Sequence, residues 1–184
     1  MRIGLLLGVE AILVSSAFAG TISVQPSPLD VMAGQTFALE ISASGITDLY
    51  AFQFDLGFTP GILAASSVTE GPLLVSGGTT IFVPGVIDNV TGTISFTADS
   101  LVGSVPGVSA DGVLAIVQMQ AHGSGEGPIT LANVVLLDSA LSEIIAATRD
   151  GSVSVSGVPE PRSCALCVVP VGVLFWRLYR KSRC

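Results

Sequence analysis

The stretch Leu49-Tyr50-Ala51-Phe52-Gln53-Phe54-Asp55-Leu56-Gly57-Phe58 alternates large apolar residues with small or polar ones. One face of an extended chain here carries Tyr50, Phe52, Phe54, Leu56 and Phe58, and the other carries Ala51, Gln53, Asp55 and Gly57. Successive side chains of a β-strand point to opposite faces, so this period of two predicts a strand with one face in the core. An aromatic stripe can also stack on sugars, but five consecutive apolar positions are more typical of a core.

Further short runs rich in β-formers lie on both sides of this stretch. They are Thr21–Gln25, Thr36–Ser44, Ile62–Thr69, Thr79–Val83, Thr93–Ala98, Val113–Ala121, Ile129–Leu137, Ile144–Thr148 and Ser152–Val155. Gly, Pro, Asn or Asp separate most of them, and no long stretch has helical periodicity. Many short strands with such turn signals predict an all-β sandwich of two sheets. The connections are too short for helical crossovers, so antiparallel pairing is expected.

The charge of the central body excludes one class of partner. The chain has 184 residues, of which 49% are hydrophobic and 11% are charged. Of seven basic residues only Arg149 lies between Gly20 and Gly157, together with twelve of the fourteen acids, which gives this body a formal net charge of −11. The phosphate backbone of a nucleic acid would be repelled.

The N-terminus has the pattern of a cleavable signal peptide. Arg2 precedes the largely apolar run Ile3–Val14, and Ala17-Phe18-Ala19 before Gly20 is the small-x-small pattern that signal peptidase accepts. We predict that residues 1–19 are removed. A buried N-terminal helix is the alternative, and the cleavage pattern argues against it.

The C-terminus combines a short motif, an apolar run and a basic end. Val158-Pro159-Glu160-Pro161 precedes the apolar stretch Ser163–Trp176, and the basic residues Arg177, Arg180, Lys181 and Arg183 follow. The run predicts a short transmembrane helix with its basic end in the cytoplasm and the body on the far side. Residues 158–184 resemble the PEP-CTERM sorting signal, which exosortase recognises. This resemblance implies a bacterial envelope protein, anchored at least transiently in the inner membrane and then placed at the cell surface or in the extracellular matrix.

The cysteines belong to the same tail. Cys164, Cys167 and Cys184 all follow the body, so no disulfide forms within it. Cys164 and Cys167 make a C-x-x-C, but the second ligand pair of a zinc site and the βαβ context of a redox motif are missing. They are predicted to be apolar tail residues.

Residues 20–157 resemble the cohesin domain family. The segment Phe54-Asp55-Leu56-Gly57-Phe58-Thr59-Pro60-Gly61-Ile62-Leu63 is similar to the cohesin pattern F-x-L-x-Y-D-P-x-x-L, with Phe58 for Tyr and Thr59 for Asp. Other segments in matching order are Gly34-Gln35-Thr36-Phe37, Gly92-Thr93-Ile94-Ser95-Phe96, Gly112-Val113-Leu114-Ala115, Ile129-Thr130-Leu131 with Leu137-Asp138, and Gly151-Ser152-Val153-Ser154-Val155. The resemblance implies an antiparallel jelly-roll sandwich of about nine strands.

Catalytic chemistry has little support in the body. His122 is the only histidine and lies beside the glycine-rich segment Gly123–Pro128, where an exposed loop residue is expected rather than a general base. No G-x-S-x-G motif supplies a nucleophile. The protein is therefore predicted not to be an enzyme, and no cofactor is predicted. Weak calcium candidates are Asp88, Asn89, Asp99 and Asp111, without the spacing of a calcium loop.

Three functions agree with these features. By resemblance, the first is a non-catalytic cohesin-like module that docks a dockerin-type partner in a polysaccharide-related surface system. The second is a carbohydrate-binding module, although the body has no Trp and only Tyr50 among tyrosines. The third is a structural protein of an extracellular matrix or biofilm.

Overall fold

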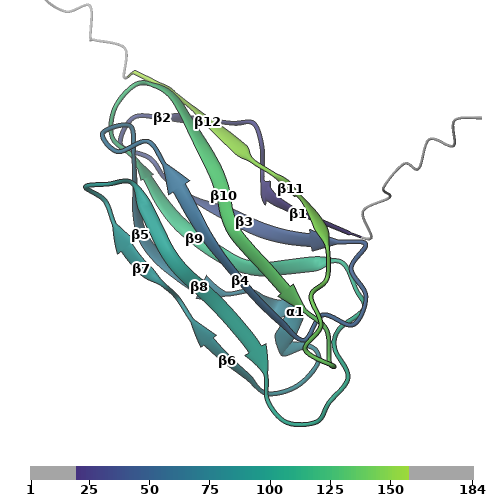
Figure 1. The fold of residues 1–184 in the computed structure, drawn as a ribbon. Coiled ribbons are helices and arrows are strands. Elements are labelled where there is room, and N and C mark those ends of the chain that lie inside the picture. Colours follow the sequence, from purple (N-terminus) through teal and green to yellow (C-terminus); the bar gives the residue numbers. More distant parts are fainter. Residues whose placement is uncertain (1–19, 158–184) are drawn as a thin grey trace, which may run out of the picture.

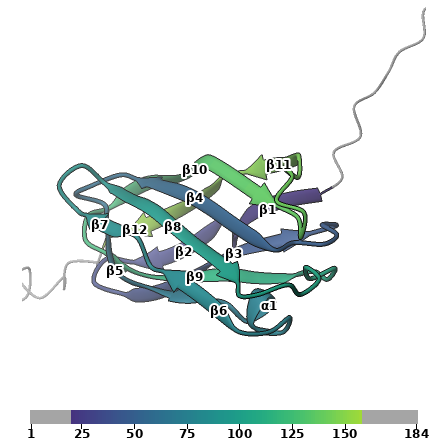
Figure 2. The ribbon, with the colours of Figure 1, turned by 60° about the horizontal axis from the view of Figure 1, so that its bottom comes forward.

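Two β-sheets pack face to face across residues 20–157, which are the part of the chain that the computed structural model describes (Figure 1). The predicted all-β sandwich is confirmed. Strand β1 starts and strand β12 ends at opposite ends of the sandwich (Figures 1 and 2). The predicted signal peptide (1–19) and sorting signal (158–184) lie outside the described residues.

One sheet has five strands in the order β11-β1-β3-β9-β5. Their bounds are β1 Gly20–Gln25, β3 Thr36–Ser44, β5 Leu63–Glu70, β9 Gly112–Ala121 and β11 Ala146–Arg149. The two longest neighbours, β3 and β9, run antiparallel at its centre. Their inward residues, such as Leu39, Ile41 and Val117, are fully buried and supply one half of the core.

The other sheet has seven strands. Its path is β2-β12-β10-β4-β8-β6, and β7 pairs with β8 beside it. The bounds are β2 Leu29–Met32, β4 Ala51–Phe58, β6 Thr80–Val83, β7 Val86–Asp88, β8 Thr93–Leu101, β10 Gly125–Leu137 and β12 Gly151–Ser156. Strands β10, β4 and β8 run side by side and form the middle of this sheet (Figure 2).

The core prediction for β4 is confirmed. Phe52, Phe54, Leu56 and Phe58 are all less than 7% exposed, and the rings of Phe52 and Phe54 stack with centroids 5.9 Å apart. Tyr50, just before the strand, is half-buried against the same core, and its hydroxyl donates to the carbonyl oxygen of Gly103 at 2.6 Å. The aromatic stripe is therefore interior and is not a sugar platform.

The strand count and the pairing differ from the prediction. The structure has twelve strands instead of about nine, and the pairs β1–β11 and β2–β12 are parallel. Strands β2 and β7 have four and three residues, which is too short for a visible alternation. The two strands of each parallel pair are separated in sequence by most of the domain, so the chain returns to the same edge without a local crossover.

The described residues include one short helix, α1 (Pro72–Val75), which was not predicted. Leu73 and Leu74 are buried, and the helix packs against β8 and β9 (Figure 2). Within residues 20–157 no helix has the length and hydropathy to cross a membrane.

The glycine before β8 gives a test of the packing between β4 and β8. Gly92 has a φ of +74°, and a Cβ built on it would lie 2.2 Å from the carbonyl oxygen of Phe58. We expect Gly92→Ala to lower the free energy of unfolding by about 2–4 kcal/mol, because it adds a clash to backbone strain. Urea unfolding of residues 20–157 measures this. Gly34→Ala is the matched control, with a φ of +90° and open space around the new Cβ, and we expect a loss of about 1 kcal/mol. Equal losses in both variants would show that the contact with Phe58 is unimportant.

Candidate functional site

The outer face of the seven-stranded sheet carries an apolar groove of about 370 Å³. It runs over β10, β4, β8 and β6. Two cross-strand rows line it, in the strand order just given: Leu137, Ala51, Ser100 and Ile81 in one row, and Val135, Gln53, Ala98 and Val83 in the other. The residues of the two middle strands are mostly small, while those of the flanking strands are aliphatic, so the surface is low in the middle and raised at both sides.

The walls of the groove are exposed although they are apolar. Ile81 is 64% exposed, and Val83 and Val135 are 38% and 37% exposed. Four neighbouring strands span about 14 Å, since strands in a sheet lie about 4.8 Å apart. An α-helix with its side chains is about 10–12 Å across. The groove therefore has the width of one helix.

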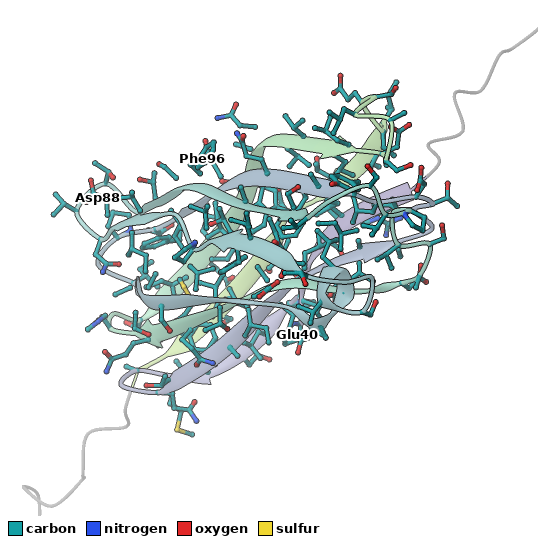
Figure 3. All side chains as sticks on the ribbon, turned by 90° about the horizontal axis from the view of Figure 1, so that it is seen from below. Glu40, Asp88 and Phe96 are labelled. Atoms are coloured by element: carbon teal, nitrogen blue, oxygen red, sulfur yellow. The ribbon has the colours of Figure 1, made fainter. Side chains whose placement is uncertain are left out.

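One end of the groove is closed by Phe96, whose side chain is 54% exposed. Figure 3 shows Phe96 on one side of the sandwich and Glu40, from the five-stranded sheet, on the opposite side. Asp55 on β4 accepts a hydrogen bond from the backbone N–H of Phe96 at 2.7 Å and another from the side-chain amide of Asn133 at 2.6 Å. This carboxylate thus joins the three strands at the end of the groove.

The groove presents no basic group and no exposed acid. Among its lining residues only Asp99 is ionisable, and that side chain is 3% exposed. Arg149, the one lysine or arginine of residues 20–157, lies on β11 in the other sheet. Contacts in the groove would therefore be mainly apolar, and exposed apolar patches of this kind mark interaction sites.

Beneath the groove, Asp99 of β8 points into the core. One carboxylate oxygen accepts the backbone N–H of Ser100 at 2.8 Å, and the other has no hydrogen-bond partner among the described residues. Burial, and after it the nearby carboxylate of Glu70, raises the pKa of Asp99 to about 7. Glu70 ends β5, and it accepts a hydrogen bond from the hydroxyl of Thr80 on β6. The bond between Thr80 and Glu70 thus links the two sheets beside Asp99.

The four calcium candidates are not brought together. Asp88 accepts the backbone N–H groups of Val90 and Thr91, and these bonds lower its pKa. The other candidates also have separate positions: Asn89 bonds both the N–H and the C=O of Ala65, Asp111 accepts the N–H of Gly45 at 2.7 Å, and Asp99 is in the core. In residues 20–157 no three His, Cys, Asp or Glu side chains lie together as metal ligands would.

Other predicted residues fall away from the groove. His122 is exposed between β9 and β10, as expected. Gly20 is the first residue of β1, whereas Ala17, Ala19 and the sorting residues lie outside the described part of the chain. The groove itself was not predicted from the sequence. Its floor residues, Ala51 and Ala98, have no chemistry that marks them, and the regular alternation Ile94-Ser95-Phe96-Thr97-Ala98 gives no sign of the bulge in β8.

A family model described as the cohesin domain matches residues 22–155, nearly all of the sandwich. The chain belongs to the cohesin domain family. Cohesin domains are non-catalytic binding modules, in agreement with the prediction that this protein is not an enzyme. A relative is the cellulose-binding protein A of Clostridium cellulovorans, 24% identical over 163 residues. That alignment covers 80% of this chain and 9% of the relative, so the cohesin chain spans a small part of that protein's length.

Solved structures share the fold of this cohesin domain. A type I cohesin–dockerin complex from Clostridium thermocellum matches with a TM-score of 0.63 and 14% identity, covering 78% of this chain and 97% of that one. The third cohesin of ScaC from Acetivibrio cellulolyticus, in complex with the ScaB dockerin, matches with a TM-score of 0.60 and 17% identity (74% and 98% covered). A non-cellulosomal cohesin from the archaeon Archaeoglobus fulgidus matches with a TM-score of 0.57 and 15% identity (74% and 91% covered).

The stability of this cohesin domain should fall as the pH rises from about 4 to about 7. The pKa of Asp99 is raised from 3.8 to about 7 in the folded chain. The stabilisation by its proton is therefore complete below about pH 4 and is lost as the pH rises through about 7. Asp99→Asn removes this titration. We expect the free energy of unfolding of the unsubstituted domain, but not of the variant, to drop on the order of 2–3 kcal/mol between about pH 5 and about pH 8.

Urea unfolding at both pH values measures this difference. The bonds to Asp48 and Asp88 lower the pKa of each below 3.8, so their contributions are lost at lower pH. Asp30→Asn, at an exposed position on β2, is the matched control and should follow the unsubstituted domain. The same drop in Asp99→Asn would rule out Asp99 as its source.

Proposed function

We propose that this cohesin domain is a non-catalytic module that binds a dockerin, and that the groove on the seven-stranded sheet receives a helix of that dockerin. The observation that carries the proposal is the exposed, uncharged groove of helical width within a cohesin domain. Several of the matching solved structures, including the two described above, are cohesin–dockerin complexes. In one of them the dockerin carries a mutation in its C-terminal helix, from Ile-Asn to Ser-Ile.

The chemistry of the groove indicates what such a helix would present. Its walls are the aliphatic side chains of β10 and β6, and its floor is mostly small and apolar. A helix places residues i, i+3, i+4 and i+7 on one face, so apolar residues at this spacing would fill the groove. Basic or acidic residues on that face would lose water without a charged partner, which disfavours them.

The setting we propose is a polysaccharide-related system outside the cytoplasm. The similarity to part of a cellulose-binding protein and the cohesin family support this setting. The sequence motifs at both ends support export by a signal peptide and sorting by exosortase through Val158-Pro159-Glu160-Pro161 and the basic end. The tail would anchor the chain in the inner membrane before the cohesin domain reaches the surface or matrix.

A bulky charge on the groove floor tests the docking surface. Ala98 is half-buried in the centre of the groove and points outward from β8. We expect Ala98→Arg to weaken dockerin binding at least about 30-fold, because the side chain fills the groove and places an unpaired charge in an apolar contact. The probes are purified dockerin modules encoded in the source genome, with affinity measured by calorimetry.

The matched control for this test is Ala38→Arg. Ala38 is exposed on β3, on the outer face of the five-stranded sheet. This variant should bind like the unsubstituted protein. Equal loss in both variants, or no loss in Ala98→Arg, would contradict the assignment of the groove. Binding of a polysaccharide in affinity electrophoresis, with no dockerin bound, would favour the carbohydrate-binding alternative.

Replacement of Glu160 and Pro161 by alanine tests the sorting motif. If exosortase reads this motif, the double variant should accumulate in the inner membrane with its tail intact, while the unsubstituted chain leaves it. Cell fractionation and intact-mass measurement of the recovered chains report both properties. A matched substitution of Ser156 and Gly157, just before the motif, should not change the distribution. Identical fractions for both double variants would argue against sorting through this motif.

A further inference from the structure

Phe96 combines an exposed side chain with an unfavourable backbone. Its φ is 61°, in the left-handed region that L-residues other than glycine rarely adopt. The side chain is 54% exposed, so burial in the core does not offset this strain. A strained residue persists only where its surroundings enforce it, and such residues cluster at functional sites.

Asp55 is the group that enforces this conformation. Between the β4 residues Phe54 and Leu56, which are paired with Thr97 and Ile94, β8 contains one residue more than β4. The extra residue removes the Phe96 N–H from the strand ladder, and one carboxylate oxygen of Asp55 accepts it at 2.7 Å. Hydrogen bonds to a charged acceptor are stronger than those between neutral groups.

Strand β10, the other neighbour of β4, is also irregular next to Asp55. Strand β10 also has one extra residue, between Ala132 and Val135, and Asn133 there has a φ of 49°. The second oxygen of Asp55 accepts the side-chain amide of Asn133 at 2.6 Å. One carboxylate therefore fixes a bulge on each side of the central strand, at the end of the groove.

We infer that Asp55 is a positioning residue for partner binding: by holding the bulge of β8, it keeps Phe96 outward as the aromatic side chain that closes the groove. This inference rests on the proposed dockerin contact. The ring of Phe96 offers an apolar surface to the last turn of a helix lying in the groove. Aromatic residues are prominent among the anchors of protein interfaces.

The experiment uses the full chain in detergent, with two readouts. Amide hydrogen exchange at Phe96, followed by NMR, reports the bulge in the free protein. Calorimetry with the dockerin modules of the source genome reports binding. The variants are Asp55→Ala, the conservative Asp55→Asn, and Phe96→Ala. Asp111→Ala is the matched control, because Asp111, like Asp55, accepts a backbone N–H from a residue distant in sequence, that of Gly45, but lies away from the groove.

We expect Asp55→Ala to speed exchange at Phe96 at least about tenfold and to weaken dockerin binding about ten- to thirtyfold, the same loss as in Phe96→Ala. The double variant Asp55→Ala with Phe96→Ala should bind no more weakly than Phe96→Ala alone, because both substitutions remove the same contact. Asp55→Asn keeps an acceptor for the Phe96 N–H and should recover most of the affinity. Asp111→Ala should change neither readout.

Unchanged exchange at Phe96 in Asp55→Ala would overturn the inference whatever the binding data show. Faster exchange with unchanged affinity would overturn it as well, since Phe96 would then have no part in docking. If the unsubstituted chain binds no dockerin, the proposed function fails, and the docking role of Asp55 fails with it. Exchange at Phe96 would still decide whether Asp55 holds the bulge.

Phe96→Gly separates positioning from ordinary packing. Glycine adopts a positive φ without strain, so this variant should melt roughly 2–4 °C higher than the unsubstituted chain while binding dockerin as weakly as Phe96→Ala. A Phe96 that only stabilises the fold would give a lower melting temperature in Phe96→Gly, and that result would contradict a functional origin of the strain.

Discussion

Strand β4 is the element on which both the core and the groove depend. It is paired on both sides, by β10 and β8, so its two faces have to serve two different environments. The inward face carries the phenylalanines and Leu56, which are removed from water. The outward face carries Ala51 and Gln53, which form part of the groove floor. Because the side chains of a strand alternate, a slip of one residue would exchange these faces and destroy both.

Strand β8 does not keep this simple alternation. Strict alternation from the buried Ile94 would turn Phe96, Ala98 and Ser100 inward. The extra residue opposite Asp55 reverses which side chains of β8 face the core, so that Thr97, Asp99 and Leu101 are buried instead. The same bulge therefore exposes Phe96, places small residues on the groove floor, and buries an aspartate. These three features are consequences of a single irregularity.

The sequence predicted the elements whose alternation is long and regular. The β4 stripe, the sandwich and most strands follow from period two and from turn residues. The bulges do not, because each depends on a cross-strand bond between residues distant in sequence, such as Asp55 and Asn133. The predicted strand ended at Ala98, so Asp99 was expected outside the strand and was considered as an oxygen ligand for calcium, whereas β8 continues to Leu101. The parallel edge pairs also need the folded chain to be recognised.

The buried aspartate also shows why the groove needs support from Asp55. An acid beside Glu70 in the core is most stable with a proton, so the inward orientation of Asp99 becomes less favourable as the pH rises from about 4 to its pKa of about 7. A return to strict alternation would release Asp99 to solvent and bury Phe96, but it would also turn the buried Leu101 outward. The bonds from Asp55 to the two bulges oppose this slip. The carboxylate of Asp55 thus keeps Ala98 and Ser100 facing outward and preserves the shape of the groove. It does so from a position beside the groove and not within it.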